Sequence, residues 1–91
     1  MIAEGFLAQG ARVLDVFSHV GGFSLAALAG GAVQALAVDS SAAALSLAVK
    51  GAAASGFGDR LEIRQGDAFA VMEALAAEGA RYDVVVCDPP A

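Results

Sequence analysis

Four aspartates are spaced so that they could form one acidic ligand-binding site. Asp15 lies late in a short apolar run, and Asp39 directly follows a second run. Asp67 and Asp88 follow a third and a fourth. If these runs are parallel strands, their carboxyl ends share one edge of a sheet, where open α/β sheets bind ligands. We therefore expect the four carboxylates to converge there, as acceptors for hydroxyl and amino groups.

Basic residues mostly avoid these ends. Three arginines precede apolar runs, a lysine lies in mid-helix and one arginine, the exception, lies on a predicted strand: Arg12, Arg60, Arg81, Lys50 and Arg64. A phosphate site would favour lysine or arginine, so we predict a cationic ligand with hydroxyls instead. S-adenosylmethionine fits, with a sulfonium, an ammonium and a ribose diol. Its carboxylate could bind free backbone N–H groups near Gly21 and Gly22.

Alternating strands and helices must position these residues. Hydrophobic periodicity predicts strands over 12–17, 33–38, 61–65 and 82–87, and helices over 2–9, 23–29, 41–55 and 68–78. A turn at 18–22 follows the first strand. Asp39 with Ser40 is expected to cap the helix over 41–55, and Asp67 the next one.

Strand character predicts the order of the sheet. The first, second and fourth strands are mostly apolar, as buried central strands are, whereas 61–65 alternates and suits an edge. We predict an α/β fold: a Rossmann-like, doubly wound parallel sheet of order 3-2-1-4 in three αβα layers. The fourth strand would then be a bare apolar edge. We expect a fifth strand to cover it in a parent protein, so that residues 1–91 form a partial domain truncated after the Asp-Pro-Pro sequence.

Composition excludes several classes of protein. The 91 residues allow one domain, and 58% hydrophobic against 16% charged residues excludes intrinsic disorder. Apolar runs are too short for a membrane helix, and the start lacks the basic region of a signal peptide. A single cysteine, Cys87, excludes an internal disulfide and fits a reducing cytosol, so we expect a cytoplasmic protein. The net charge of −5 argues against nucleic-acid binding by this stretch alone. We expect no metal site and no membrane partner.

Four motifs resemble one known family. Residues 13–24 (VLDVFSHVGGFS) resemble the first motif of class I S-adenosylmethionine-dependent methyltransferases. They are closest to the bacterial ribosomal-RNA large-subunit methyltransferases that modify cytosine at carbon 5. Residues 37–41, 65–69 and 87–91 are similar to the next three motifs of that family. The resemblance spans residues 11–91, one motif per βα unit.

The resemblance implies a set of S-adenosylmethionine-binding residues: Asp15, Phe17, Ser18, His19, Gly21, Gly22, Phe23, Asp39, Ser40, Asp67, Ala68, Phe69 and Asp88. Asp15 and the backbone at 18–22 would hold the methionine end. Asp39 would bind the ribose hydroxyls. One departure is that His19-Val20 replaces the Tyr-Thr common in the family, which removes a hydroxyl near the cofactor.

The last two motifs would bind adenine and face the reaction. The resemblance implies that Asp67 accepts from the adenine amino group, with Ala68 and Phe69 beside the ring. Asp88, Pro89 and Pro90 would be the catalytic segment facing the methyl group and the target base. In this family the nucleophilic cysteine and the RNA-binding appendage come from other regions. Binding of ribosomal RNA would therefore use parts absent from these residues, and full activity from this stretch is not expected.

Each feature also has a structural interpretation. Asp39 and Asp67 could be helix caps only, the two glycines a simple turn, and Asp-Pro-Pro a strand terminator. Cys87 is expected to be a buried core residue, and His19 a loop residue rather than a base. Asp15 is harder to dismiss, because a carboxylate in an apolar strand is costly unless it is paired.

Other functions stay open at this point. The apolar stripe of Phe69, Met72 and Leu75 is expected to be core. A cofactor-binding module without catalysis, an NAD-type dehydrogenase domain and a methyltransferase acting on a base nitrogen are the alternatives. The Asp39 contact with a ribose is shared with NAD-binding folds, and Asp-Pro-Pro also occurs in nitrogen methyltransferases.

Overall fold

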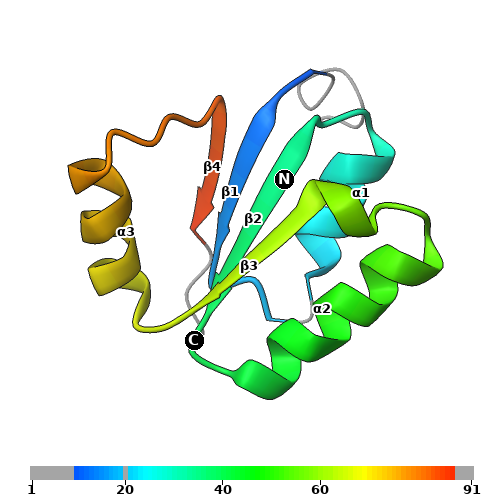
Figure 1. The fold of residues 1–91 in the computed structure, drawn as a ribbon, viewed down its shortest axis with the longest axis horizontal. Coiled ribbons are helices and arrows are strands. Elements are labelled where there is room, and N and C mark those ends of the chain that lie inside the picture. Colours follow the sequence, from blue (N-terminus) through cyan, green and yellow to red (C-terminus); the bar gives the residue numbers. More distant parts are fainter. Residues whose placement is uncertain (1–9, 20, 88–91) are drawn as a thin grey trace.

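A computed structural model describes residues 10–19 and 21–87; the predicted helix over 2–9 and the Asp88-Pro89-Pro90 segment lie outside them. The elements are β1 (Arg12–Val16), α1 (Gly22–Ala29), β2 (Gln34–Asp39), α2 (Ala42–Ala54), the 3-10 turn η1 (Gly58–Arg60), β3 (Leu61–Gln65), α3 (Ala68–Ala77) and β4 (Val84–Cys87) (Figure 1). The predicted succession of strands and helices is confirmed. Among the described helices, none is long and apolar enough to cross a membrane.

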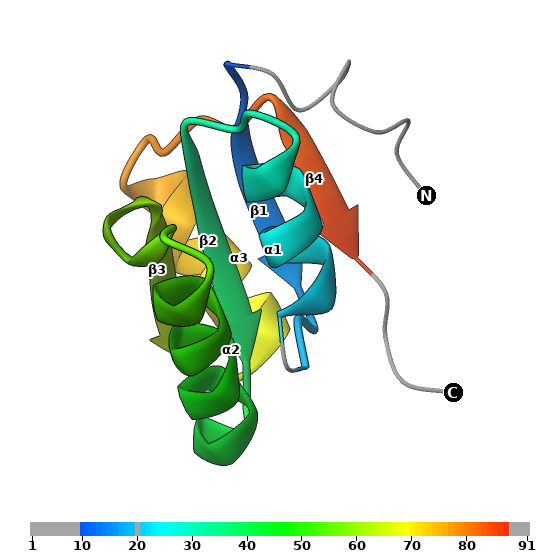
Figure 2. The ribbon, with the colours of Figure 1, turned by 90° about the vertical axis from the view of Figure 1, so that its right-hand side faces the viewer.

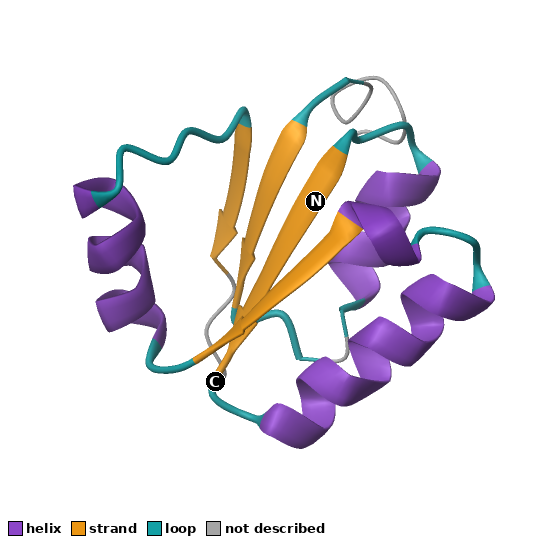
Figure 3. Ribbon diagram, viewed as in Figure 1, coloured by secondary structure: helices purple, strands orange, loops and turns teal. Residues whose placement is uncertain are grey.

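The four strands form one parallel sheet in the order β3-β2-β1-β4. The predicted order 3-2-1-4 is therefore confirmed. Helices α1 and α2 lie on one face and α3 on the other, which gives the three predicted layers (Figures 2 and 3). Because every strand runs the same way, all carboxyl ends meet at one edge, which we call the carboxyl edge.

Alternate residues of β1 enter two separate cores. Val13 packs with Leu28 of α1 in one cluster, while Leu14 and Val16 pack with Leu75 of α3 in the other. Both faces of the central strands are covered, so these strands must be apolar throughout. An aspartate inside such a strand is consequently buried between sheet and helix.

Several predicted boundaries shift by one or two residues. Phe17 has φ of 62° and lies beyond β1, because a left-handed residue cannot extend a strand. Asp39 is the last residue of β2 rather than the residue after it. Strand β4 begins at Val84, two residues later than predicted, and Tyr82 packs instead against the α3 core while Arg12 lies over its ring.

The prediction that Cys87 is buried is wrong, because its side chain is exposed. Val85 and Cys87 pair with Leu14 and Val16 and so lie on the α3 face of the sheet. There Val85 is 57% exposed, because no element among the described residues covers this face of β4. Alternation along β4 correctly predicted which face of the strand Cys87 lies on. It could not predict that no helix covers this face of β4 among the described residues.

The predicted core stripe of α3 is wrong by one position at its start. The helix buries Ala68, Val71 and Leu75, with Met72 half-buried, whereas Phe69 is 66% exposed. At 100° per residue, a stripe through Ala68 and Val71 leaves Phe69 on the adjoining face. The large ring of Phe69 is therefore available at the carboxyl edge.

Candidate cofactor-binding site

Asp15 is the buried acid of the site. It is 3% exposed, and the Ser24 hydroxyl on α1 donates to its Oδ2 at 2.7 Å. Burial raises the pKa of Asp15, although the hydroxyl and backbone N–H of Ser24 partly offset this. Sequence reasoning missed Ser24; the signal was that an acid in an apolar strand needs a donor, and Ser24 is the first hydroxyl on the following helix.

Replacing Ser24 with alanine should lower the free energy of unfolding by about 1–3 kcal/mol, because Asp15 would lose its hydroxyl donor while staying buried. Urea unfolding followed by circular dichroism measures this change. The exposed Ser46→Ala on α2 is the matched control and should change stability little. Equal stability of the two variants would show that the Ser24 contact contributes nothing.

The raised pKa of Asp15 predicts a pH dependence. A raised pKa means that the proton stabilises the fold, so this stabilisation is complete below the ordinary value of 3.8 and is lost as the pH rises through the folded-state pKa. Asp15→Asn keeps the acceptor for Ser24 without the charge. Thermal unfolding should therefore show equal stabilities near pH 3.8 and a growing advantage for Asp15→Asn toward pH 7.

Asp39 is the second acid of the site; it is largely buried as well, with 9% of its surface exposed, but its pKa shifts in the opposite direction. Its Oδ2 accepts from the His19 backbone N–H and its Oδ1 from that of Ser41, both at 2.9 Å. Burial alone would raise its pKa, but these N–H groups and the nearby His19 side chain outweigh burial and lower it. Asp39 therefore stays ionised at neutral pH, and its second lone pairs can accept from ligand hydroxyls.

The predicted capping role of Asp39 with Ser40 is wrong. Ser41 is the N-cap of α2, and its hydroxyl accepts from the Ala44 backbone N–H at 3.1 Å. Asp39 instead fixes the chain between β2 and α2 through its contact with Ser41. Ser40 is exposed at this turn, and its carbonyl accepts from the side chain of Gln65.

The loop between β1 and α1 folds tightly over the carboxyl edge. Phe17, His19 and Gly21 all have left-handed backbones, with φ of 62°, 55° and 78°. The Ser18 N–H donates to the Val38 carbonyl of β2, and the Gly21 N–H donates to the Ser18 carbonyl. Non-glycine residues rarely adopt this conformation, and they gather where surrounding contacts enforce it, often at ligand sites. The predicted turn is confirmed for residues 18, 19 and 21, whereas Gly22 already begins α1; Val20 lies outside the described residues.

Two features of this loop fit a bound polar ligand. The Ser18 hydroxyl is buried and has no hydrogen-bond partner within the described part of the chain. Helix α1 has Gly21 as its N-cap, which offers no side-chain acceptor to the first N–H groups of the helix, near Phe23. A buried unpaired hydroxyl and an uncapped helix start are both unfavourable without a partner. A ligand with a carboxylate would satisfy them.

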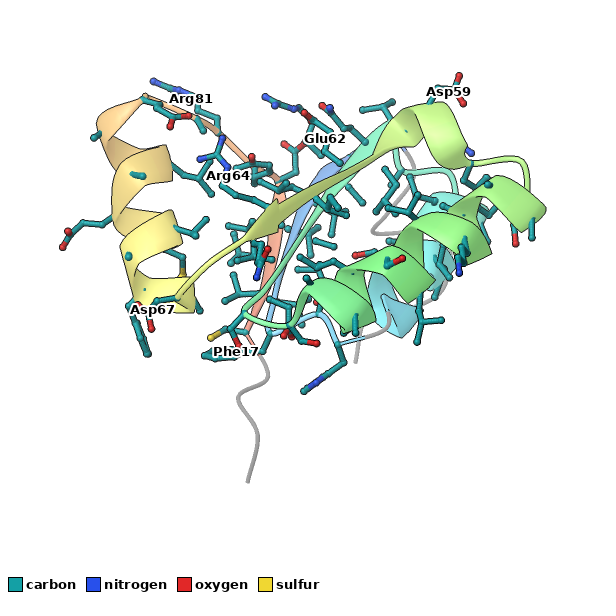
Figure 4. All side chains as sticks on the ribbon, turned by 60° about the horizontal axis from the view of Figure 1, so that its bottom comes forward. Phe17, Asp59, Glu62, Arg64, Asp67 and Arg81 are labelled. Carbon is teal, nitrogen blue, oxygen red and sulfur yellow. The ribbon has the colours of Figure 1, made fainter. Side chains whose placement is uncertain are left out.

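Asp67 and Phe69 extend the site across the sheet. Asp67 Oδ2 accepts from the Ala70 N–H at 2.9 Å, so its predicted role as the α3 cap is confirmed. The rings of Phe17 and Phe69 meet edge to face, 6.2 Å apart between centroids. The side chain of Ala68, which lies between Asp67 and Phe69 in the sequence, is 5% exposed and packs in the α3 core. Figure 4 shows Phe17 and Asp67 at the same end of the molecule.

The charges of the molecule are separated along the strands. Arg64 lies on β3, yet its guanidinium reaches back to Glu78 at the end of α3, 3.3 Å away. Figure 4 shows Arg64 and Arg81 at the end opposite Asp67. Arg64, the arginine that the sequence predicted on a strand, therefore points away from the carboxyl edge. Among the described acids near this edge, Asp67 is exposed, Asp39 is largely buried and Asp15 is fully buried.

The whole chain, residues 1–91, matches the model of a protein family described as conserved hypothetical protein 95. The chain belongs to this family. The resemblance to methyltransferases is confirmed by its relatives. The chain is 43% identical over 89 residues to MJ1653 of Methanocaldococcus jannaschii, a presumed ribosomal RNA large subunit methyltransferase. It is 36% identical over 84 residues to ribosomal RNA large subunit methyltransferase I of Erwinia tasmaniensis.

The chain spans about a fifth of the length of these relatives. The two matches cover 97% and 91% of the chain, but only 23% and 21% of the respective relative. The chain thus corresponds to one part of those enzymes.

Solved structures confirm the Rossmann-like methyltransferase fold. SMU.776, a presumed methyltransferase in complex with S-adenosylhomocysteine, superposes with a TM-score of 0.86 at 28% identity, covering 91% of this chain and 22% of that one. A SAM-dependent methyltransferase from Agrobacterium tumefaciens gives 0.80 at 30% identity, covering 88% and 26%. This chain therefore shares its architecture with SAM-dependent methyltransferases.

Proposed function

We propose that this chain binds S-adenosylmethionine at the carboxyl edge and forms part of an enzyme that methylates a ribosomal RNA base. The observation that carries the proposal is the position of Asp39. Its ionised carboxylate, held by the His19 and Ser41 N–H groups, lies at the end of β2 beside the loop that leads to the uncapped start of α1. An acid for ribose hydroxyls and N–H groups for a carboxylate match the two polar ends of the cofactor.

The other predicted site residues would each contact a different part of the cofactor. Gly22, Phe23 and the Ser18 hydroxyl would bind the methionine end, while Asp67, Phe17 and Phe69 would surround adenine. Asp15, buried against Ser24, would keep α1 in place and act on the cofactor through its position. When bound, S-adenosylmethionine supplies a methyl group on a positively charged sulfur. Aspartates with no lysine or arginine nearby attract this positive sulfur, whereas they would repel the phosphates of NAD.

The target is proposed to be cytosine carbon 5 of ribosomal RNA in the cytoplasm. The relatives' names support a large-subunit ribosomal RNA substrate, and the four motifs resemble the carbon-5 enzymes. Asp88, Pro89 and Pro90 would face the base, which must leave its stack to be reached. The attacking cysteine and the RNA-binding region would lie outside residues 1–91, which would form a partial methyltransferase domain.

Calorimetry tests the cofactor, and nucleoside analysis tests the reaction. S-adenosylhomocysteine should bind and NAD should not; NAD binding alone would replace the proposal with a dehydrogenase domain. Methyl-labelled S-adenosylmethionine with ribosomal RNA should then give 5-methylcytidine when the longer protein is used. Label on a purine nitrogen would assign a nitrogen methyltransferase, and cofactor binding with no transfer would leave a binding module.

A further inference from the structure

The outer edge of β3 is open in the described part of the chain. β3 is the terminal strand of the sheet, so the backbone N–H and C=O groups along its outer side have no strand to pair with there. Natural proteins usually protect such an edge with a proline, a bulge or charges that repel a second strand. β3 contains no proline, and its two charged residues, Glu62 and Arg64, have opposite signs. These charges can therefore attract a suitably placed second strand.

The two faces of β3 differ in character. Glu62 and Arg64 lie on the α3 face, because their partners in β2 belong to the core beneath α3, and Figure 4 shows both on the same side of the ribbon. Ile63 lies on the opposite face, the one that α1 and α2 cover, yet it is 43% exposed. A second strand along this edge must therefore match two charges on one face and an apolar side chain on the other.

Helix α2 adds an apolar group on the same face as Ile63. Its Gly51 lies against Leu25 of α1. At 100° per residue, Val49 lies about 160° around the helix from Gly51, on the side away from α1. Because α2 packs on β2 and β3, this side of the helix borders the outer edge of the sheet, and Val49 is 42% exposed there. Covering Val49 and Ile63 with a second copy would remove apolar surface from water.

One antiparallel register of two β3 strands matches both faces. A closed two-fold dimer needs antiparallel strands. With Ile63 opposite its own copy, Glu62 of each strand faces Arg64 of the other. A shift by two residues would place Glu62 opposite Glu62, or Arg64 opposite Arg64, and like charges repel. A shift by one residue would place Glu62 opposite Ile63. The sequence of β3 is thus self-complementary about Ile63.

Both charges can exchange their present partners for those of a second copy. Arg64 lies 3.3 Å from Glu78, with 40% and 55% of the two side chains exposed, and an ion pair this exposed contributes little to stability. Glu62 accepts from the side chain of Gln34, and this contact is exposed as well. Replacing these surface contacts with pairs across two strands therefore costs little.

We propose that two copies of this chain associate through the outer edges of β3, antiparallel about Ile63, to form one continuous sheet. The two α2 helices then lie on one face and the two α3 helices on the other, because a two-fold axis through the sheet keeps its faces. The carboxyl edges of the two copies point in opposite directions, so both candidate cofactor sites stay open. The association is independent of the cofactor that those sites bind.

The test is sedimentation equilibrium of the chain over a range of concentrations, with a reducing agent to exclude a disulfide through the exposed Cys87. The parent should form a dimer with a dissociation constant on the order of 100 μM, because few side chains are buried at such an edge. Glu62→Arg and Arg64→Glu should each weaken association by about tenfold or more, because each places like charges opposite one another twice. Mixed together, the two variants should associate at least as tightly as the parent, since every glutamate then faces an arginine.

Two further variants make the result specific to β3. Val85→Lys, on the exposed face of β4, is the matched control and should leave the dimer unchanged. Ile63→Lys places two like charges at the two-fold axis without touching the Glu78 contact, and it should weaken association even if a charge variant of Glu62 or Arg64 is less stable. Circular dichroism shows which variants are folded like the parent.

The outcomes decide between β3 and other surfaces. A parent that stays monomeric up to about 1 mM overturns the proposal. Association that Val85→Lys abolishes and Glu62→Arg leaves intact would assign the contact to β4 instead. A mixture of the folded charge variants that associates no more tightly than either alone also overturns the pairing about Ile63. Weak association of each charge variant with recovery in the mixture supports it.

Discussion

Replacing Gly21 with alanine should lower the free energy of unfolding by about 2–5 kcal/mol, from backbone strain and overpacking together. Gly21 has φ of 78°, which costs an alanine residue free energy, and the added Cβ would lie 2.6 Å from the Cβ of Ala48. Ala48 is fully buried on α2, so neither atom can move without shifting a backbone. Urea denaturation followed by far-UV circular dichroism measures the loss.

Gly22 provides the matched control for this substitution. Its added Cβ would meet no atom within 4 Å, and Gly22 begins α1. Gly22→Ala should therefore keep or slightly increase stability, by up to about 1 kcal/mol. Equal losses in the two variants would contradict the assignment of Gly21 as the tightly packed glycine. Weaker S-adenosylhomocysteine binding by a stable Gly22→Ala would also indicate that this open side of the loop receives the ligand.

The two glycines illustrate what a sequence motif leaves open. The pair predicted close approach of the backbone to a ligand, and it did not distinguish the two positions. In the folded chain Gly21 makes room for α2, and Gly22 is the one that faces open space. A motif records which residue type is needed at a position but not which neighbour requires it.

The order of the sheet was predictable because burial dictates strand composition. Strands β1 and β2 have helices on both faces and are apolar, while Glu62 and Arg64 mark β3 as an edge. The positions of Asp15, Asp39 and Asp67 followed from the same pattern, since parallel strands end together. These predictions needed only the periodicity of the hydrophobic residues and the parallel direction of the strands.

The errors arose where a side chain's environment depends on distant elements. Cys87 alternates like a core residue, but whether a helix covers its face is not encoded in β4 itself. Phe69 fits one helical stripe and Ala68 another, and only packing against Leu14 and Val16 selects between them. The left-handed backbones of Phe17 and His19 flank Ser18, and the N–H groups of Ser18 and His19 donate to β2, so this conformation depends on a distant strand and carried no local signal.

The two acids at the ends of the central strands have opposite electrostatic environments. Asp15 is desolvated and its pKa is raised, whereas Asp39 is bonded to N–H groups and its pKa is lowered. An acid that resists ionisation suits a structural contact such as that with Ser24. An acid that stays ionised at the edge of the sheet suits a ligand with positive charge and hydroxyls. These environments support the proposed division, in which Asp15 holds α1 in place and Asp39 binds the cofactor.

Asp39→Ala should consequently weaken S-adenosylhomocysteine binding by about 100-fold or more, because hydrogen bonds to a charged acceptor contribute roughly 1.5–3 kcal/mol each. The same change leaves the His19 and Ser41 N–H groups without their acceptor. Stability should therefore also fall, by about 1–3 kcal/mol. Calorimetry measures binding, and urea unfolding shows whether the variant is folded under those conditions.

Asp39→Asn removes the negative charge of the side chain but keeps its size, so it shows how much of the effect of Asp39→Ala is due to charge. It keeps one oxygen acceptor but turns an NH₂ group toward one of the two N–H donors, so binding should fall between that of the parent and Asp39→Ala. Asp59→Ala removes an equal charge from η1, which Figure 4 places far from Asp67, and should leave binding unchanged. Parent-like binding by a folded Asp39→Ala would remove the ribose contact on which the cofactor assignment depends.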